Sequence, residues 1–101
     1  MQFIESVGEN TVIKLSGKLD YATASVLMEE LKTLIGQGVK RIDYHCAELE
    51  YISSAGIRAM VFTKQKIDKN VEVDVCLHKA SQTVKEVFSM SGLEDYFEFV
   101  E

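Results

Sequence analysis

The sequence has no proline and little positive charge. Its 11 Lys and Arg residues are outnumbered by 16 Asp and Glu residues, which gives a net charge of −5 at pH 7. A nucleic-acid-binding surface must concentrate basic side chains to neutralise phosphates, so this balance argues against a nucleic-acid partner. No apolar run approaches the roughly 20 residues that a membrane-spanning helix needs, and we therefore expect no membrane insertion.

Linkers, repeats and low-complexity tracts are also missing. Because no Ser-, Gly- or Pro-rich stretch divides the chain, we expect residues 1–101 to form a single domain with one core. Residues 1–10 have neither the basic nor the apolar region of a signal peptide, which favours a cytoplasmic location.

Cysteines are few and widely spaced. Cys46 and Cys76 lie 30 positions apart, without a C-x-x-C motif or a nearby pair of histidines. Zinc sites usually have ligands close together along the chain, so we expect neither a metal nor another cofactor. In the cytoplasm both thiols would be reduced and would pack as small apolar side chains.

What the sequence does contain is an alternation of β-type and helical patterns. Strands are expected at residues 2–6, 11–16, 39–46, 71–77 and 97–100, and helices at 21–35, 54–69 and 81–91. The residue types of Gly8-Glu9-Asn10 suit a hairpin between the first two strands. The order ββαβαβαβ predicts an α/β fold with a mixed, mostly parallel sheet.

The strands also predict how the helices are distributed. Apolar and polar residues alternate over 41–46 and 71–77, so that Asp43, His45, Glu72, Asp74 and Cys76 share one face. Buried parallel strands covered on both faces are usually apolar throughout, whereas alternation indicates one packed face and one wet face. We therefore expect a two-layer domain with the helices mainly on one face of the sheet.

The most informative segment is Leu49-Glu50-Tyr51-Ile52-Ser53-Ser54-Ala55-Gly56-Ile57. Two serines stand where a strand gives way to a helix, and one of them is expected to cap that helix. The other is free for function, because a helix N-terminus tolerates an added phosphate. Ala55 and Gly56 are small and are expected to leave the hydroxyls accessible. Asp20 is expected to cap the preceding helix, beside the serine segment.

At 100° per residue, the helix after these serines has two dissimilar sides. The side expected to face inward carries Ile57, Met60, Val61 and Ile67, and the other carries Ala55, Arg58, Ala59, Phe62, Lys66 and Lys69. Phe62 among alanines and basic residues is either part of a partner-binding patch or packed against a neighbouring helix.

Catalysis has weak support in the sequence. The serine segment is not the G-x-S-x-G motif of hydrolases, and only His45 and His78 could act as the base. His45 is expected on the open face, whereas His78 could approach Ser54 but has no evident acid to orient it. The phosphate-loop pattern is missing as well. We therefore expect a protein that is not an enzyme.

Three motifs resemble those of STAS domains, and in particular bacterial anti-sigma factor antagonists. They are Gly17-Lys18-Leu19-Asp20, the segment from Leu49 to Arg58, and Met90-Ser91-Gly92-Leu93, in the family's order and spacing. The resemblance covers essentially the whole chain. It implies a mixed sheet with helices on one side, in agreement with the alternation described above.

The resemblance also implies a function. An antagonist of this family binds an anti-sigma factor that is itself a serine kinase, is released when that kinase phosphorylates it, and is restored by a serine phosphatase of the PP2C type. Aligned on Gly56, the phosphorylated position falls on Ser54. The family's usual aspartate before it is replaced by Ser53, a second candidate, and its usual hydroxyl residue after it by Ala55.

The partner surface implied in this way includes Asp20, which in relatives lies near the kinase interface. The expected contact residues are Asp20, Ser53, Ser54, Ala55, Gly56, Arg58, Ala59 and Phe62. Two alternatives remain open at this point. One is a STAS subunit that docks constitutively on a transporter ATPase or other signalling complex without phosphorylation, and the other is a hydrolase.

Overall fold

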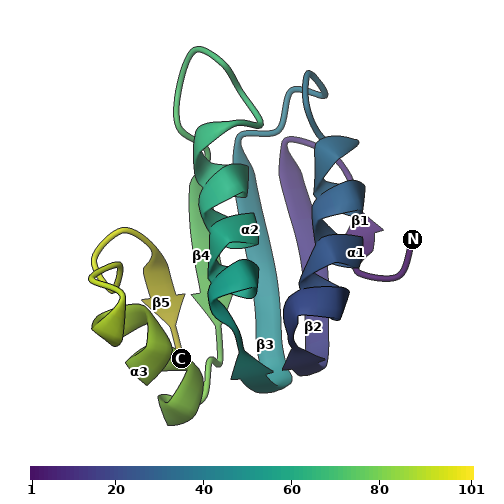
Figure 1. Cartoon of the computed structure of the whole chain (residues 1–101). Helices are drawn as coiled ribbons and strands as arrows, with labels where there is room; N and C mark the ends of the chain where they lie inside the picture. Colours follow the sequence, from purple (N-terminus) through teal and green to yellow (C-terminus); the bar gives the residue numbers. More distant parts are fainter.

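The computed structural model describes all 101 residues and places three helices against one face of a five-stranded sheet (Figure 1). The strands are β1 (Ile4–Ser6), β2 (Asn10–Leu19), β3 (Arg41–Ile52), β4 (Asp74–His78) and β5 (Glu98–Val100), and the helices are α1 (Tyr21–Lys32), α2 (Ser54–Gln65) and α3 (Gln82–Met90). The predicted order and the two-layer arrangement are confirmed.

The sheet has the strand order β1-β2-β3-β4-β5. Only the β1–β2 pair is antiparallel, as expected for the hairpin, and the three other pairs are parallel. A parallel neighbour requires a crossover, and α1, α2 and part of the segment containing α3 provide these connections. Strands that are neighbours in sequence are thus neighbours in space, so their carboxyl ends lie side by side.

The predicted boundaries were least accurate at the centre of the sheet. β2 continues to Leu19 and β3 to Ile52, so residues that were expected to form loops are strand residues. Register shifts after Lys14 and after Gly17 interrupt the regular alternation there, which hides the strand pattern in the sequence. In contrast, α2 ends at Gln65 rather than at Lys69.

A continuous core of 26 residues lies between the helices and the sheet. Its sheet side is supplied by alternate residues, such as Ile13, Leu15, Ile42 and Tyr44. Burial raises the pKa of the Tyr44 hydroxyl, and that hydroxyl pairs with the Thr63 hydroxyl of α2 at 3.1 Å. Thr63 also donates to the Met60 carbonyl, so α2 and β3 are joined by a satisfied polar link inside the core.

The side chains on the opposite face of the sheet are less exposed to solvent than predicted. Asp43 and His78 are half-buried and Cys76 is wholly buried, although Cys76 was expected on the wet face. Its thiol is covered because the side chain of Arg41 reaches across from β3 to the Cys76 sulfur. Glu72 is not on this face as a strand residue, since it precedes β4 and its carboxylate accepts a hydrogen bond from Tyr96.

None of the three helices has the length and apolar character to span a bilayer.

Candidate functional site

The starts of α1 and α2 lie next to each other at the carboxyl ends of β2 and β3 (Figure 1). β2 and β3 pair in parallel, with Leu19 opposite Ile52, and the next residue of each strand caps a helix. Asp20 caps α1 and Ser53 caps α2. The positions predicted to lie side by side, Asp20 and Ser53, are therefore brought together by strand register.

Asp20 forms a capping box with Thr23. The Thr23 backbone N–H donates to Asp20 Oδ1 at 2.9 Å, and the Asp20 backbone N–H donates to Thr23 Oγ1 at 2.9 Å. Hydrogen bonds from the side chain and backbone of Thr23 hold the pKa of the exposed Asp20 carboxyl below its usual range. Asp20 therefore caps α1, as predicted from the sequence, and its ionised carboxylate lies at the helix start.

Ser53 has its hydrogen-bonding capacity committed to the fold. Its Oγ donates to the Leu19 carbonyl oxygen at 2.8 Å and accepts from the Gly56 N–H at 3.2 Å. The Ser53 backbone N–H donates to the same Leu19 oxygen at 2.9 Å. The expectation that one serine of the pair caps α2 is thus confirmed, and that serine is Ser53.

Ser54 is the first residue of α2, and its side chain is exposed. Its hydroxyl makes no hydrogen bond to the rest of the chain, in contrast to the neighbouring Ser53. A hydroxyl in this position faces solvent beside the N-terminal end of the helix dipole, where an added anion is favoured. Of the two candidate serines, Ser54 is therefore the one with an exposed hydroxyl that makes no hydrogen bond within the chain.

Gly56 and Ala59 do not belong to the accessible surface. Gly56 is buried, and a Cβ on it would lie 2.8 Å from both Ile52 Cγ1 and Leu19 Cδ2. Its small size thus lets α2 approach the ends of β2 and β3, rather than exposing the serines as expected. Ala59 is wholly buried, because α2 packs against α1 as well as against the sheet. The prediction that these two residues are directly available to a partner was wrong.

A shallow groove of about 260 Å³ runs between α1 and α2 beside Ser54. Ala55 and Arg58 line it from α2, and Tyr21 lines it from the first position of α1. The side chain of Tyr21 is 76% exposed. Sequence analysis did not identify Tyr21 as a site residue. The signal that could have identified it is its position directly after the helix cap Asp20 and next to the serine segment.

Phe62 lies in a second hollow farther along α2. It is half-buried, packs on the edge of the core, and shares an apolar surface with Met28 of α1 and with Leu93 after α3. The expectation that Phe62 packs against a neighbouring helix is therefore confirmed, and its role in a partner-binding patch stays a prediction. Val61, which was expected to face inward, lies in the same hollow.

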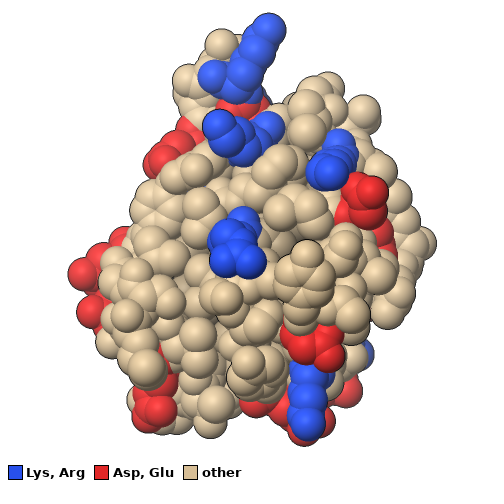
Figure 2. Space-filling model, viewed as in Figure 1, with Lys and Arg blue, Asp and Glu red and all other residues tan.

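Of the basic side chains on the outer side of α2, only Arg58 is close to Ser54. Arg58 is one helical turn away and exposed, whereas Lys66 lies at the far end of α2, about 18 Å along the axis at 1.5 Å per residue. Lys69 lies beyond that end, so neither lysine is close to Ser54. Figure 2 shows basic side chains gathered toward the top of the view, over the end of α2, and mostly uncharged surface lower on that helix.

The two histidines are remote from Ser54. His45 and His78 lie opposite each other in the β3–β4 register, on the face of the sheet that carries no helix, and their rings stack. His78 Nε2 is 2.7 Å from Asp43 Oδ1 rather than near the serine segment. The sequence left open that His78 could approach Ser54, and this is wrong, so a serine–histidine pair is not formed.

Comparison with known proteins agrees with this geometry. The model of the STAS domain family matches residues 1–101. A Bordetella bronchiseptica protein, BtrV, assigned by its name to the anti-sigma factor antagonists, is 31% identical over 83 residues, which are 82% of this chain and 71% of that protein.

Solved structures share the fold. The anti-sigma factor antagonist SpoIIAA in its unphosphorylated form superposes with a TM-score of 0.75 at 24% identity, over 97% of this chain and 86% of that one. The phosphorylated form of SpoIIAA, a Bacillus cell fate determinant, gives 0.69 at 25% identity over 97% and 89%. A sulfate transporter family protein from Wolinella succinogenes gives 0.69 at 13% identity over 94% and 80%. Together with the whole-chain family match, these likenesses show that the chain belongs to the STAS domain family.

Proposed function

We propose that this protein is an anti-sigma factor antagonist whose binding surface is formed by the starts of α1 and α2 and is controlled by phosphorylation of Ser54. Its partner would be an anti-sigma factor with serine-kinase activity, and a PP2C-type phosphatase would reverse the modification. The protein would act in the cytoplasm, as a binding protein rather than an enzyme. The observation that carries the proposal is the contrast between Ser53, which is bound into the fold, and Ser54, which is exposed and unbonded.

Phosphorylation at Ser54 is compatible with the fold. The modification adds a charge of about −2 at the start of α2, where the helix dipole and unpaired N–H groups favour an anion. No hydrogen bond of the unmodified protein has to break, because the Ser54 hydroxyl has none. The structure can therefore remain folded in both states, and the effect falls on the surface.

The same charge would strongly disfavour docking. The groove beside Ser54 is lined by Tyr21, Ala55 and Arg58, and a partner that covers it must remove water from any phosphate there. Taking an ion out of water costs several kcal/mol unless the partner supplies a matching charge. A coupling of about 3 kcal/mol already changes affinity about 150-fold, so no change of conformation is required for release.

Tyr21 and Arg58 are the side chains expected to contribute most to binding. Tyrosine and arginine are enriched among the residues that dominate protein interfaces, and these two border the groove from opposite helices. Asp20 is charged and adjacent, and is suited to a basic side chain of the partner. Phe62 would extend the contact along α2.

Binding of the cognate anti-sigma factor tests the proposal. Ser54→Ala should bind like the wild type but resist release by kinase and ATP, whereas Ser54→Glu should bind at least about 100-fold more weakly. Ser89→Glu, the same change at an exposed position of α3, is the matched control and should bind normally. Equal affinity of Ser54→Glu and Ser89→Glu would refute the switch.

Mass spectrometry identifies the modified residue. Incubation with the kinase and ATP should add one phosphate to the wild type and to Ser53→Ala, and none to Ser54→Ala. Phosphate that persists in Ser54→Ala would place the modification elsewhere.

A second candidate is constitutive docking on a transporter ATPase, since the same fold occurs in the Wolinella succinogenes protein named for sulfate transport. In that case the partner would bind Ser54→Glu and wild type alike, and a kinase would leave the protein unmodified.

A further inference from the structure

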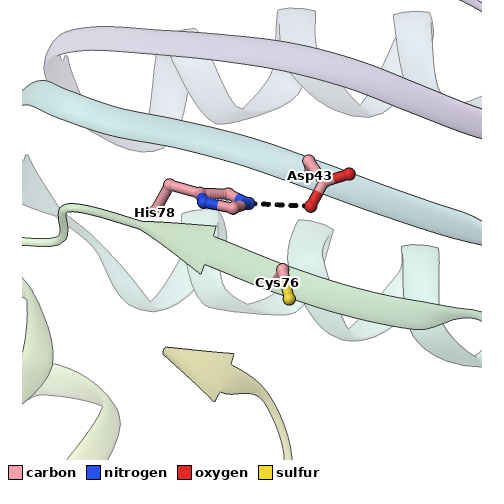
Figure 3. A group of neighbouring side chains, drawn as sticks. All are labelled: Asp43, Cys76 and His78. Carbon is pink, nitrogen blue, oxygen red and sulfur yellow. Dashed lines mark hydrogen bonds and ion pairs between the residues drawn. The ribbon is translucent and has the colours of Figure 1, made fainter. Parts of the chain in front are cut away.

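A cluster of polar side chains lies on the face of the sheet opposite the helices (Figure 3). β3 and β4 pair in parallel register with Asp43 opposite Cys76 and with His45 opposite His78. Because side chains two residues apart on a strand share a face, these four side chains project to the same side. The proposed switch at Ser54 uses none of them.

Three of these residues converge. One oxygen of Asp43, the sulfur of Cys76 and one ring nitrogen of His78 all lie within 4.8 Å of one another. Figure 3 shows His78 and Asp43 in direct contact above the Cys76 thiol, with His78 Nε2 at 2.7 Å from Asp43 Oδ1. The site is sheltered, since the Cys76 residue is wholly buried and the Asp43 and His78 side chains are 17% and 26% exposed.

The three groups form a recognisable ligand set. Carboxylate oxygen, imidazole nitrogen and thiolate sulfur bind Zn²⁺ at about 2.0–2.3 Å, and catalytic or exchangeable zinc sites often have three protein ligands and one solvent molecule. A tetrahedron with such bonds separates its ligands by roughly 3.3–3.8 Å. Small side-chain rotations of groups already within 4.8 Å would reach this geometry. Ca²⁺ and Mg²⁺ prefer oxygen ligands alone, so a thiol and an imidazole favour zinc over them.

We propose that Asp43, Cys76 and His78 form a Zn²⁺-binding site with its fourth coordination position open to solvent. Two hydrogen-bonded neighbouring strands hold the three ligands, so little chain ordering is needed for binding. On binding, a zinc–sulfur bond forms and the thiol proton is released to water, and His78 Nε2, which donates to the Asp43 carboxylate in this structure, gives up its hydrogen to Nδ1 or to water so that it can bind zinc. The sequence spacing did not predict this site, because Asp43 is brought to the Cys76-x-His78 pair only by the pairing of β3 with β4.

The positive charge that lies against the proposed ligands in this structure is that of Arg41. Its guanidinium donates to Cys76 Sγ at 2.9 Å and lies 3.1 Å from Asp43 Oδ1. Zinc would displace it toward solvent, where 35% of the Arg41 side chain is already exposed. The affinity of the site for zinc is therefore set by competition with an internal positive charge, and removal of that charge should tighten binding.

Titration of the purified full-length chain with Co²⁺, followed by displacement with Zn²⁺, tests the site. The wild type should take up one equivalent of Co²⁺ with a thiolate-to-cobalt charge-transfer band, and Zn²⁺ should abolish that band. Cys76→Ser should lose the band, whereas Cys46→Ala, which removes the other thiol on the helix side of the sheet, should keep it. A wild type that shows no band, or a band lost in Cys46→Ala and kept in Cys76→Ser, would overturn the proposal.

The remaining ligands have their own controls. Asp43→Asn and His78→Gln keep the size of each side chain and should weaken zinc binding by about 10-fold to 100-fold or more. His45→Gln removes the stacked histidine outside the trio and should bind almost as the wild type does. Arg41→Ala should bind about tenfold more tightly, because one repelling charge is gone. Circular dichroism must show that each variant is folded; unchanged affinity in all of the ligand variants and in Arg41→Ala would place the metal elsewhere.

Discussion

The starts of α1 and α2 are neighbours with the same position in the fold, yet they are stabilised differently. The α1 start is local, since Asp20 and Thr23 bond each other and depend on nothing outside the helix and the strand before it. The α2 start is tertiary, because Ser53 bonds the carbonyl of Leu19 in a different strand and Gly56 packs on Leu19 and Ile52. The proposed phosphorylation site thus lies on the helix start that is joined to the sheet by contacts with both β2 and β3.

The largest change in the free energy of unfolding is expected for a substitution at Gly56, which would test the difference between the two helix starts. Gly56→Val places carbon atoms where Leu19 and Ile52 already lie, and overpacking of this kind should lower the free energy of unfolding by about 3 kcal/mol. Ala55→Val is the matched control, because Ala55 borders an open groove, and it should cost only about 0.5 kcal/mol in helix propensity. Chemical denaturation measures both. Equal losses would show that close packing at Gly56 is not what fixes α2.

The two serines provide the next test. Ser53→Ala removes the α2 cap and its bond to Leu19 and should cost about 1 kcal/mol of unfolding free energy. Ser54→Ala removes an exposed, unbonded hydroxyl and should stay within about 0.5 kcal/mol of the wild type. The same denaturation experiment compares them. A larger loss for Ser54→Ala than for Ser53→Ala would reverse the roles assigned to the two residues.

The smallest effect concerns the charge at the α1 start. Thr23 holds the pKa of Asp20 below its usual range, so the stability that ionised Asp20 contributes is present at neutral pH and is lost as pH falls through the lowered pKa. Thr23→Ala should move the pKa of Asp20 back toward its ordinary value of about 3.9, and Thr23→Ser should not. Titration of the Asp20 carboxyl by NMR measures this. A pKa of Asp20 that is unchanged in Thr23→Ala would show that the capping box is not its cause.

Much of the architecture could be predicted because it is encoded locally. The alternation over residues 41–46 is a property of neighbouring residues, and it correctly placed the helices on one face of the sheet. The caps at Asp20 and at the serine pair also depend on short segments. The expected strand order then placed the Asp20 segment beside the serine segment, because the carboxyl ends of neighbouring parallel strands lie side by side.

The errors came from contacts between distant segments. Ala59 is buried because α1 lies against α2, and Cys76 is buried because Arg41 crosses from the adjacent strand. His78 pairs with Asp43 for the same reason. A helical wheel or a strand alternation describes a single element, so it cannot predict which side chains on its polar side are buried by a neighbouring element.

The carbonyl oxygen of Leu19, which accepts from both the N–H and the hydroxyl of Ser53, has a consequence for the kinetics and entropy of association. It fixes the separation between the end of β2 and the start of α2 before any partner arrives. The proposed partner, docking on Asp20 and Ser54 together, would then not have to order the backbone between them, and the entropy lost on binding would be correspondingly smaller. Encounter can proceed as rigid-body docking, so phosphate at Ser54 would act mainly on how long the complex lasts.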